Sequence, residues 1–204
     1  MKRVHVKVEF IEEVLGTSSS DPEIHRKYIA SKAEGEDKDK KMAEEIEAIG
    51  VDGVEEKATT VFPKLEDGTP FMWDYQWKGY FKDACSMLKR SGAKSAKLKA
   101  YKKDIDGTLF VSPRKVELVL PEGGEMGTCQ RPLRASTPMG ERVALASSET
   151  VPEGTTCEFD VILMKEDLLP YLIEWLDYGE WRGAGQWRNS GKGRFLYKAW
   201  EVAK

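Results

Sequence analysis

Hydrophobic and polar residues alternate at the start of the chain. Over residues 3–11, Val4, Val6, Val8 and Phe10 fall on one side of an extended backbone, and mainly polar residues fall on the other. An alternation of period two is typical of a strand with one face in the core and one in solvent. Residues 59–62 and 70–73 flank a turn at 66–68, which predicts either a hairpin or two extended arms. Further strand-like segments span residues 105–111, 114–120, 156–164 and 195–202.

A different spacing predicts two helices that each bury one face. Apolar residues recur at intervals of three and four after Asp74, and again after Asp167. The two aspartates are placed to cap these helices, Pro170 is compatible with a first helical turn, and Gly179 with a helix end. The stripes are Trp77, Tyr80, Phe81, Ala84, Cys85 and Leu88 in the first helix, and Leu168, Leu169, Leu172, Ile173 and Leu176 in the second.

Without insertions, the order of the elements is strand, helix, strand, strand, helix, strand. This order predicts an α+β fold with a ferredoxin-like (RRM-like) βαββαβ core and an antiparallel sheet. We expect a single domain over residues 1–204 with two insertions. The insertion at approximately 16–57 is acidic and contains predicted helices at 22–33 and up to 49, and the insertion at 121–150 is a loop or arm.

The net charge of −3, from 32 basic and 35 acidic residues, at first argues against a nucleic-acid-binding protein. The charge is unevenly distributed, however. Residues 34–57 hold ten acids and four lysines, residues 89–103 hold seven bases and no acid, and residues 182–198 hold five bases and no acid. Because phosphate binding responds to the local potential, both basic segments are candidate surfaces. The run at 89–103 is also compatible with an ordinary solvated helix face.

Glycines are concentrated in residues 183–193, with the spacing G-x-G-x5-G-x-G. The dinucleotide-binding motif would need a third glycine at Arg188, and the P-loop pattern fails as well. The segment instead predicts a loop with four positions free to adopt positive φ. Arg188, Lys192 and Arg194 would be counter-charges for a bound anion, and Trp187 a stacking face. A helix cap followed by a tight turn is the purely structural alternative.

These features resemble the RAMP superfamily of CRISPR-associated proteins, which has a ferredoxin-like fold. The signature of that superfamily is a C-terminal glycine-rich loop that leads through a basic residue into the last strand, as residues 191–195 do here. Residues 75–82 are similar to the start of the first helix in CRISPR backbone subunits. Residues 149–159 are similar to the turn and strand that precede the second helix.

The resemblance implies a protein that grips an RNA backbone with the glycine-rich loop and the basic face of the first core helix. RNA is the expected partner, with a CRISPR-type protein complex or self-association as further possibilities, and a stand-alone or phage-encoded relative as the alternative setting. The residues expected to contact nucleic acid are Lys78, Lys82, Arg131, Arg134, Gly183, Gly185, Trp187, Arg188, Gly191, Lys192, Gly193 and Arg194.

Two other functions stay open. Some RAMP proteins are metal-independent RNA endonucleases, and His25 and Tyr28, one turn apart on a predicted helix, are the candidates for such acid–base chemistry. The acidic insertion instead favours a phage-type inhibitor or decoy that engages a CRISPR complex or binds a signalling nucleotide. His5 has no evident catalytic neighbour in the sequence. We favour a non-enzymatic role, because two histidines at positions 5 and 25 do not support a Ser-His-Asp or Cys-His arrangement.

Cysteine count and hydropathy narrow the class of protein further. Three widely spaced cysteines argue against a disulfide scaffold, and two histidines without a Cys-x-x-Cys pair argue against zinc, so we expect no metal and no cofactor. No apolar run reaches the ~18 residues of a transmembrane helix, and no apolar signal segment follows the first residues. We therefore expect a cytoplasmic protein without membrane contacts.

Overall fold

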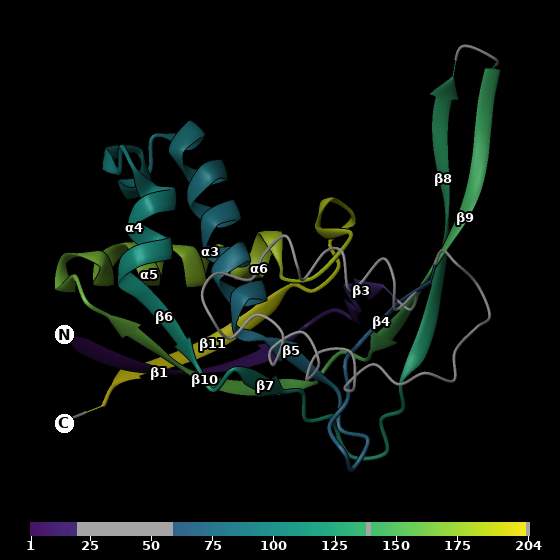
Figure 1. Ribbon diagram of the computed structural model, residues 1–204, viewed down its shortest axis with the longest axis horizontal. Coiled ribbons are helices and arrows are strands. Elements are labelled where there is room, and N and C mark those ends of the chain that lie inside the picture. Colours follow the sequence, from purple (N-terminus) through teal and green to yellow (C-terminus); the bar gives the residue numbers. More distant parts are fainter. Residues whose placement is uncertain (20–58, 138–139, 203–204) are drawn as a thin grey trace, which may run out of the picture.

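An antiparallel sheet of four strands forms the centre of the molecule, in the order β11-β1-β10-β6 (Figure 1). The strands are β1 (Lys2–Phe10), β6 (Leu109–Ser112), β10 (Thr156–Leu163) and β11 (Phe195–Glu201). This computed structural model describes residues 1–19, 59–137 and 140–202, with the backbone alone for residues 132–137 and 140–145. The predicted α+β class with an antiparallel sheet is confirmed.

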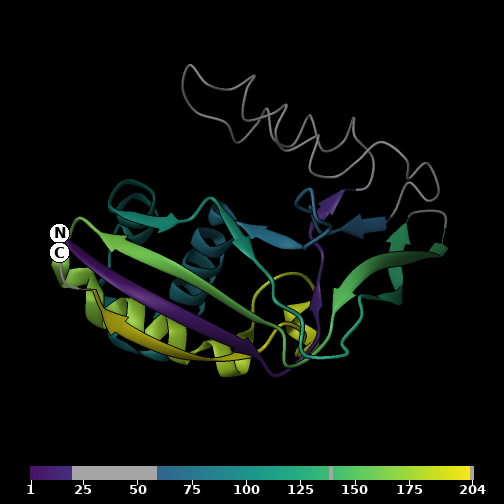
Figure 2. The same cartoon turned by 90° about the horizontal axis from the view of Figure 1, so that it is seen from below.

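Two helices cover one face of this sheet, α3 (Asp74–Leu88) and α5 (Leu169–Asp177). Figure 2 views the molecule from below, with β1 and β10 in front of α3. The core lies between the two layers, where the ring of Trp77 on α3 packs 4.4 Å from that of Phe159 on β10. The alternation in β1 is confirmed, because Val4, Val6 and Val8 are buried.

A second sheet of five strands lies beside the first. Within it β8 (Gly127–Thr137) and β9 (Gly140–Val151) form a long antiparallel hairpin that extends away from the helices (Figure 1). Its other strands are β2 (Val14–Leu15), β3 (Ser18–Ser19) and β4 (Thr59–Val61).

The arms at 59–62 and 70–73 do not pair as two strands of one hairpin. β4 pairs with β3 and runs parallel to β9, whereas β5 (Phe71–Trp73) pairs with β7 (Lys115–Glu117). Only an isolated bridge between Lys64 and Pro70 joins the two arms. Of the hairpin and the two extended arms, the structure therefore has the extended arms, which belong to different sheets.

Several local predictions are wrong. Residues 105–108 are helical rather than extended, because Ile105 is buried on one face of α4 (Tyr101–Thr108). Two short 3-10 helices, η1 (Lys89–Ser91) and η2 (Lys94–Lys97), connect α3 to α4. Asp74 is the first residue of α3 rather than its cap, and the backbone N–H of Trp73 donates instead to Oε1 of Gln76 at 2.8 Å.

The second helix also differs at both of its ends. Asp167 lies within the 3-10 helix η3 (Glu166–Leu168) and does not cap α5. Gly179 is the first residue of α6 (Gly179–Arg182), not a helix end. A Cβ at Gly179 would lie 2.3 Å from the ring of Phe195, so this glycine allows α6 to approach β11 closely. The helices predicted within residues 22–49 lie outside the described residues.

None of the helices in the described ranges is both long and apolar enough to cross a membrane.

Candidate nucleic-acid interface

The glycine-rich loop connects α6 to β11 and has an unusual backbone. Gly183, Gly185, Gly191 and Gly193 have φ angles of 74°, 82°, 80° and 70°. Trp187 also has a positive φ, of 55°, which is uncommon for a non-glycine residue. The short 3-10 helix η4 (Arg188–Ser190) lies between Trp187 and Gly191. The prediction of four glycines that adopt positive φ is confirmed.

Two of these glycines allow the two limbs of the loop to touch each other. A Cβ at Gly193 would lie 1.9 Å from the carbonyl oxygen of Ala184, and one at Gly183 would lie 2.5 Å from the carbonyl carbon of Gly193. The N–H of Ala184 donates to the carbonyl of Gly193 at 2.8 Å, and the N–H of Gly193 donates to the carbonyl of Glu13 at 2.9 Å. Around Gly191, by contrast, space is open.

The backbone donors at three of these glycines, Gly183, Gly191 and Gly193, form hydrogen bonds within the protein. The N–H of Gly183 donates to Gly179 at 3.2 Å, and that of Gly191 donates to Arg188 at 3.0 Å. Free backbone N–H groups in such a loop could bind an anion. Because those of Gly183, Gly191 and Gly193 are already bonded, binding at this loop depends mainly on side chains.

Each basic side chain at the rim of the loop lies beside an acid from another element. Arg188 Nη1 is 3.0 Å from Asp83 Oδ2 on α3. Lys192 Nζ is 2.5 Å from Glu13 Oε1, in the segment after β1. Arg194 similarly lies near Glu12, at 3.6 Å between Nη2 and Oε1. The hydrogen bond to Glu13 raises the pKa of Lys192, so the lysine stays charged throughout the physiological pH range.

These acids were missed in the sequence because they are remote from the loop along the chain. The topology gives a signal for two of them. β1 and β11 are antiparallel neighbours with Phe10 opposite Phe195. The residues that follow β1, Glu12 and Glu13, therefore lie beside those that precede β11. No comparable signal identifies Asp83, which also binds Arg182, at 2.9 Å between Oδ2 and Nε.

Arg131 connects the β8–β9 hairpin to the glycine-rich loop. Its side chain is only 8% exposed, and its guanidinium donates to Ser148 Oγ at 3.1 Å and to Gln186 Oε1 at 2.9 Å. The guanidinium also lies 5.0 Å from the centre of the Trp187 ring. Arg131 thus holds the Trp187 ring in place by contacting it from the hairpin. Trp187 is nevertheless 38% exposed. Arg134 lies on β8, and its side chain is outside the described part.

Lys78 and Lys82 lie on a different face of α3 from the one that contacts the loop. Lys78 Nζ donates to the carbonyl of Asp106 at 3.1 Å and lies over the ring of Phe110 at 4.9 Å. Lys82 forms an ion pair with the carboxylate of Asp106. The structure therefore brings the glycine-rich loop and Arg131 together, and places these two lysines against α4 and β6.

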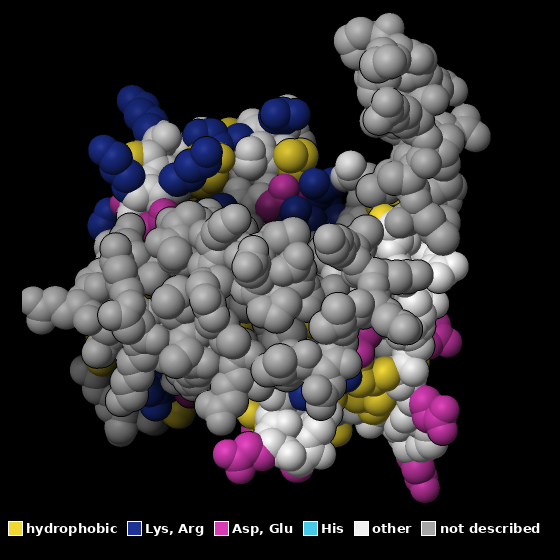
Figure 3. Space-filling view, turned by 45° about the vertical axis from the view of Figure 1, so that its right-hand side comes forward, with side chains coloured by type: hydrophobic (Ala, Val, Ile, Leu, Met, Phe, Trp, Pro, Cys, Tyr) yellow, Lys and Arg dark blue, Asp and Glu magenta, His cyan; other side chains and the backbone are white. Residues whose placement is uncertain are grey.

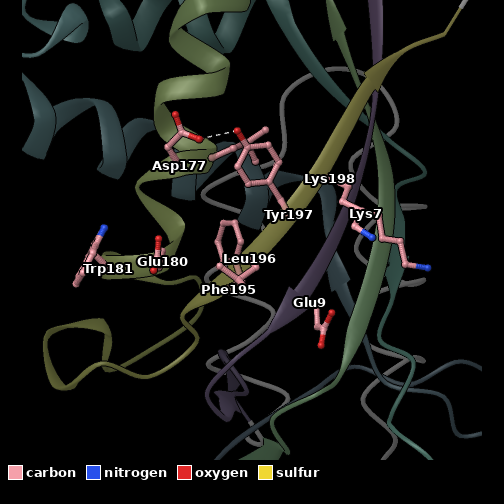
Figure 4. A pocket seen from close by; sticks show the side chains of 10 residues that line it. Lys7, Glu9, Asp177, Glu180, Trp181, Phe195, Leu196, Tyr197 and Lys198 are labelled. Atoms are coloured by element: carbon pink, nitrogen blue, oxygen red, sulfur yellow. Dashed lines mark hydrogen bonds between the residues drawn. The ribbon is translucent and has the colours of Figure 1, made fainter.

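A hollow of about 610 Å³ lies between the ends of α5 and α6 and the strands β1 and β11 (Figure 4). Trp181, which is 69% exposed, lies at its edge, and Tyr197 donates to Asp177 Oδ1 at 2.7 Å on one wall. Desolvation and this hydrogen bond raise the pKa of Tyr197. The lining holds three acids and two lysines, so its charge does not favour a phosphate (acids Glu9, Asp177 and Glu180; lysines Lys7 and Lys198).

His5 lies on the uncovered face of the sheet with acids on both sides. Its Nδ1 is 2.8 Å from Asp160 Oδ1, and its Nε2 is 3.3 Å from Glu158 Oε2. β10 therefore supplies two acidic neighbours to a histidine that has no evident catalytic neighbour in the sequence. His25 and Tyr28 lie outside the described residues.

Comparisons with known proteins identify the fold. No protein-family model matches the sequence, and no curated protein matches it. One similar structure is a chain from the cryo-EM structure of the type III-B Cmr-beta bound to cognate target RNA, with 11% identity and a TM-score of 0.57. The match covers 98% of this chain but only 60% of that one. A chain of a type IV-B CRISPR complex matches with 13% identity and a TM-score of 0.51, over 99% of this chain and 92% of that one. At these identities the similarity shows a shared fold.

Proposed function

We propose that this chain is a RAMP-like RNA-binding protein that grips the nucleic-acid backbone beside its C-terminal glycine-rich loop. The strand order β11-β1-β10-β6, with helices between β1 and β6 and between β10 and β11, supports a ferredoxin-like core. The likeness to chains from CRISPR complexes supports the same family and a CRISPR-type complex as a partner. In this proposal residues 1–204 form one RAMP-like domain, with the β8–β9 hairpin inside the insertion at 121–150.

The observation that carries the proposal is the cluster of cations around a rigid loop with an exposed indole. Arg188, Lys192 and Arg194 lie along one loop, and Trp187 is fixed there by Arg131. Cations pair with phosphates, and an indole face stacks on a base of any sequence. The arrangement therefore suits binding of single-stranded RNA without sequence specificity.

The acids around the loop determine how RNA would bind. A phosphate must replace Asp83, Glu12 or Glu13 as the partner of a loop cation. Fully exposed ion pairs contribute only about 0–1 kcal/mol each, but the side chains of these three pairs are only 19–40% exposed, so breaking them costs RNA affinity. The displaced carboxylates also stay close and repel the RNA. We therefore expect moderate affinity that falls steeply as salt is raised.

The test is the binding of a fluorescently labelled single-stranded RNA, measured by anisotropy at several salt concentrations. The double variant Arg188→Glu with Lys192→Glu should lose binding at least ~100-fold, since two phosphate contacts become two repulsions. A matched control is Lys2→Glu with Arg3→Glu, which makes the same charge change at the other end of the sheet, where the two bases pair with Glu201 and Asp160. Equal loss in both variants would mean that only net charge matters, and would overturn the proposal.

A converse change tests the role of the acids. Glu13→Gln removes the carboxylate that neutralises Lys192 and should raise RNA affinity several-fold at low salt. Unchanged or weaker binding would show that Lys192 does not meet phosphate.

A second candidate function is an inhibitor or decoy that binds a CRISPR complex through acidic residues. The observation in its favour is that every cation at the loop rim already has an acidic partner. Purified wild-type protein that fails to bind RNA at 50 mM salt but is retained on a nuclease-treated CRISPR complex would favour this function. The endonuclease candidate, centred on His25 and Tyr28, stays a prediction, and cleavage of labelled structured RNA by wild type but not by His25→Ala would support it.

A further inference from the structure

The connection between α3 and α4 has an exposed, strongly basic surface. Figure 3 shows lysine and arginine side chains gathered at the upper left of the molecule. Seven bases lie in residues 89–103, and six of them are exposed: Arg90, Lys94, Lys97, Lys99, Lys102 and Lys103. In Figure 1 this basic connection lies on the other side of α3 from the glycine-rich loop.

A partly buried polar cluster fastens the basic connection to α5. The carboxylate of Glu174, on α5, accepts hydrogen bonds from the backbone N–H groups of Lys94 and Ser95 at 2.6 and 2.8 Å. It also accepts one from Ser95 Oγ, which in turn accepts one from Trp175 Nε1 at 2.9 Å. Ser95 and Trp175 are fully buried. Hydrogen bonds therefore fasten the start of η2 to α5. A segment that is already ordered loses less conformational entropy when it binds a ligand.

Lys89 is the one base of this run that is not exposed, and its side chain makes contacts within the connection. Its ammonium group donates to the carbonyl of Leu98 at 2.6 Å and lies over the ring of Tyr101 at 5.1 Å. The other six bases point outward from a framework that does not depend on them.

Within the part of the chain that the structure describes, the charge of the connection is not neutralised, in contrast to that of the glycine-rich loop. None of the six exposed bases forms an ion pair within residues 1–19, 59–137 and 140–202. The two acids that follow on α4, Asp104 and Asp106, pair instead with Lys165 and Lys82 from other elements. An excess of positive charge therefore remains on a small, rigid surface.

We propose that this connection, residues 89–103, is a second RNA-backbone-binding surface, separate from the glycine-rich loop. The inference rests on the proposed function, since it assigns a further contact to the same RNA. A nucleic-acid backbone fits better than an acidic protein does. Lysine is depleted at protein–protein interfaces, which need an apolar centre, and no large hydrophobic side chain is exposed between residues 89 and 103. Unpaired lysines around a polar surface match a line of phosphates.

The test is the salt dependence of RNA binding in the triple variant Lys97→Gln, Lys99→Gln and Lys102→Gln. These three side chains take no part in the network around Glu174, so the fold should be unaffected. Each phosphate contact contributes ~0.7 to the slope of log K against log salt for single strands, so the slope should become shallower by ~2. The control carries arginine at the same three positions and should keep the wild-type slope and affinity.

The outcomes separate this inference from the proposed function. A shallower slope in the glutamine variant alone supports the second surface. A wild-type slope in the glutamine variant, together with loss of binding in the Arg188→Glu, Lys192→Glu double variant, overturns the second surface and leaves the glycine-rich loop as the RNA site. It would also leave the basic connection available to an acidic protein. Absence of RNA binding by the wild-type protein at 50 mM salt overturns both.

Discussion

Gly191 and Gly193 have similar positive φ angles but different surroundings. Their φ angles are 80° and 70°, yet a Cβ at Gly191 meets nothing within 4 Å, whereas one at Gly193 would overlap the carbonyl oxygen of Ala184. Positive φ alone costs a non-glycine residue about 1 kcal/mol. The second position adds a backbone clash that no rotamer relieves.

Substitution of these two glycines by alanine tests the close approach, with Gly191 as the control for Gly193. Gly191→Ala should lower the free energy of unfolding by about 1 kcal/mol, and Gly193→Ala by ~3 kcal/mol or more. Urea denaturation followed by tryptophan fluorescence measures both. Equal destabilisation would show that the two limbs of the loop do not approach each other as described.

The glycine composition was informative in the sequence, but its meaning was only partly predictable. That four glycines would take positive φ follows from the residue type. Gly183 and Gly193 allow the two limbs of the loop to approach each other, and Gly179 allows α6 to approach Phe195. These contacts could not be predicted, because they join segments that come together only on folding. The same holds for Arg131, whose spacing in the sequence gives no hint that it reaches Gln186.

At the scale of elements, the uncovered face of the sheet carries a cross-strand charge network. Lys7 on β1 donates to Glu158 on β10 at 2.7 Å, and His5 approaches the same carboxylate at 3.3 Å. The hydrogen bonds from Lys7 and then His5 lower the pKa of Glu158. A carboxyl group with a lowered pKa stabilises the fold at all pH values above its unfolded pKa.

This stabilisation should be lost as the pH falls through the folded-state pKa of Glu158. The variant Glu158→Gln removes it, so its free energy of unfolding should fall less steeply than that of wild type between roughly pH 5 and 3. Because Glu158 is 48% exposed, the difference at neutral pH should be under ~1 kcal/mol. Urea denaturation at each pH measures it, with Glu122→Gln at an exposed turn as the charge-matched control. Parallel pH profiles of wild type and Glu158→Gln would contradict the network.

The sequence predicted elements where local periodicity is strong. The alternation in β1 and the apolar stripe in α3 were sufficient to predict a strand and a helix, because each pattern reflects burial of one face. Residues 105–108 belong to a segment that the sequence predicts as a strand, and the helical burial of Ile105 depends on its packing in α4. The pairing of β4 with β9 and of β5 with β7 could not be predicted, since register between distant segments has no local signal.

At the scale of the whole molecule, the distribution of charge matters more than its sum of −3. The basic loop found in the sequence is locally neutralised by Asp83, Glu12 and Glu13. The lysine run, which is also compatible with an ordinary solvated face, is the part whose exposed cations form no ion pair with described residues. Its rigidity comes from Glu174, which lies about 80 residues away along the chain. The acids that pair with the loop and Glu174 are remote along the chain. Counting charges along the sequence therefore finds the basic segments, but not which of their cations are unpaired.

The most direct test of the central claim is to map where RNA lies on the protein. A single-stranded RNA containing 4-thiouridine is cross-linked to the wild-type protein by ultraviolet light, and the modified peptides are identified by mass spectrometry. Our account predicts cross-links within residues 183–194, around the exposed ring of Trp187. Cross-links confined to the uncovered face of β1 and β10, with none in residues 183–194, would contradict it.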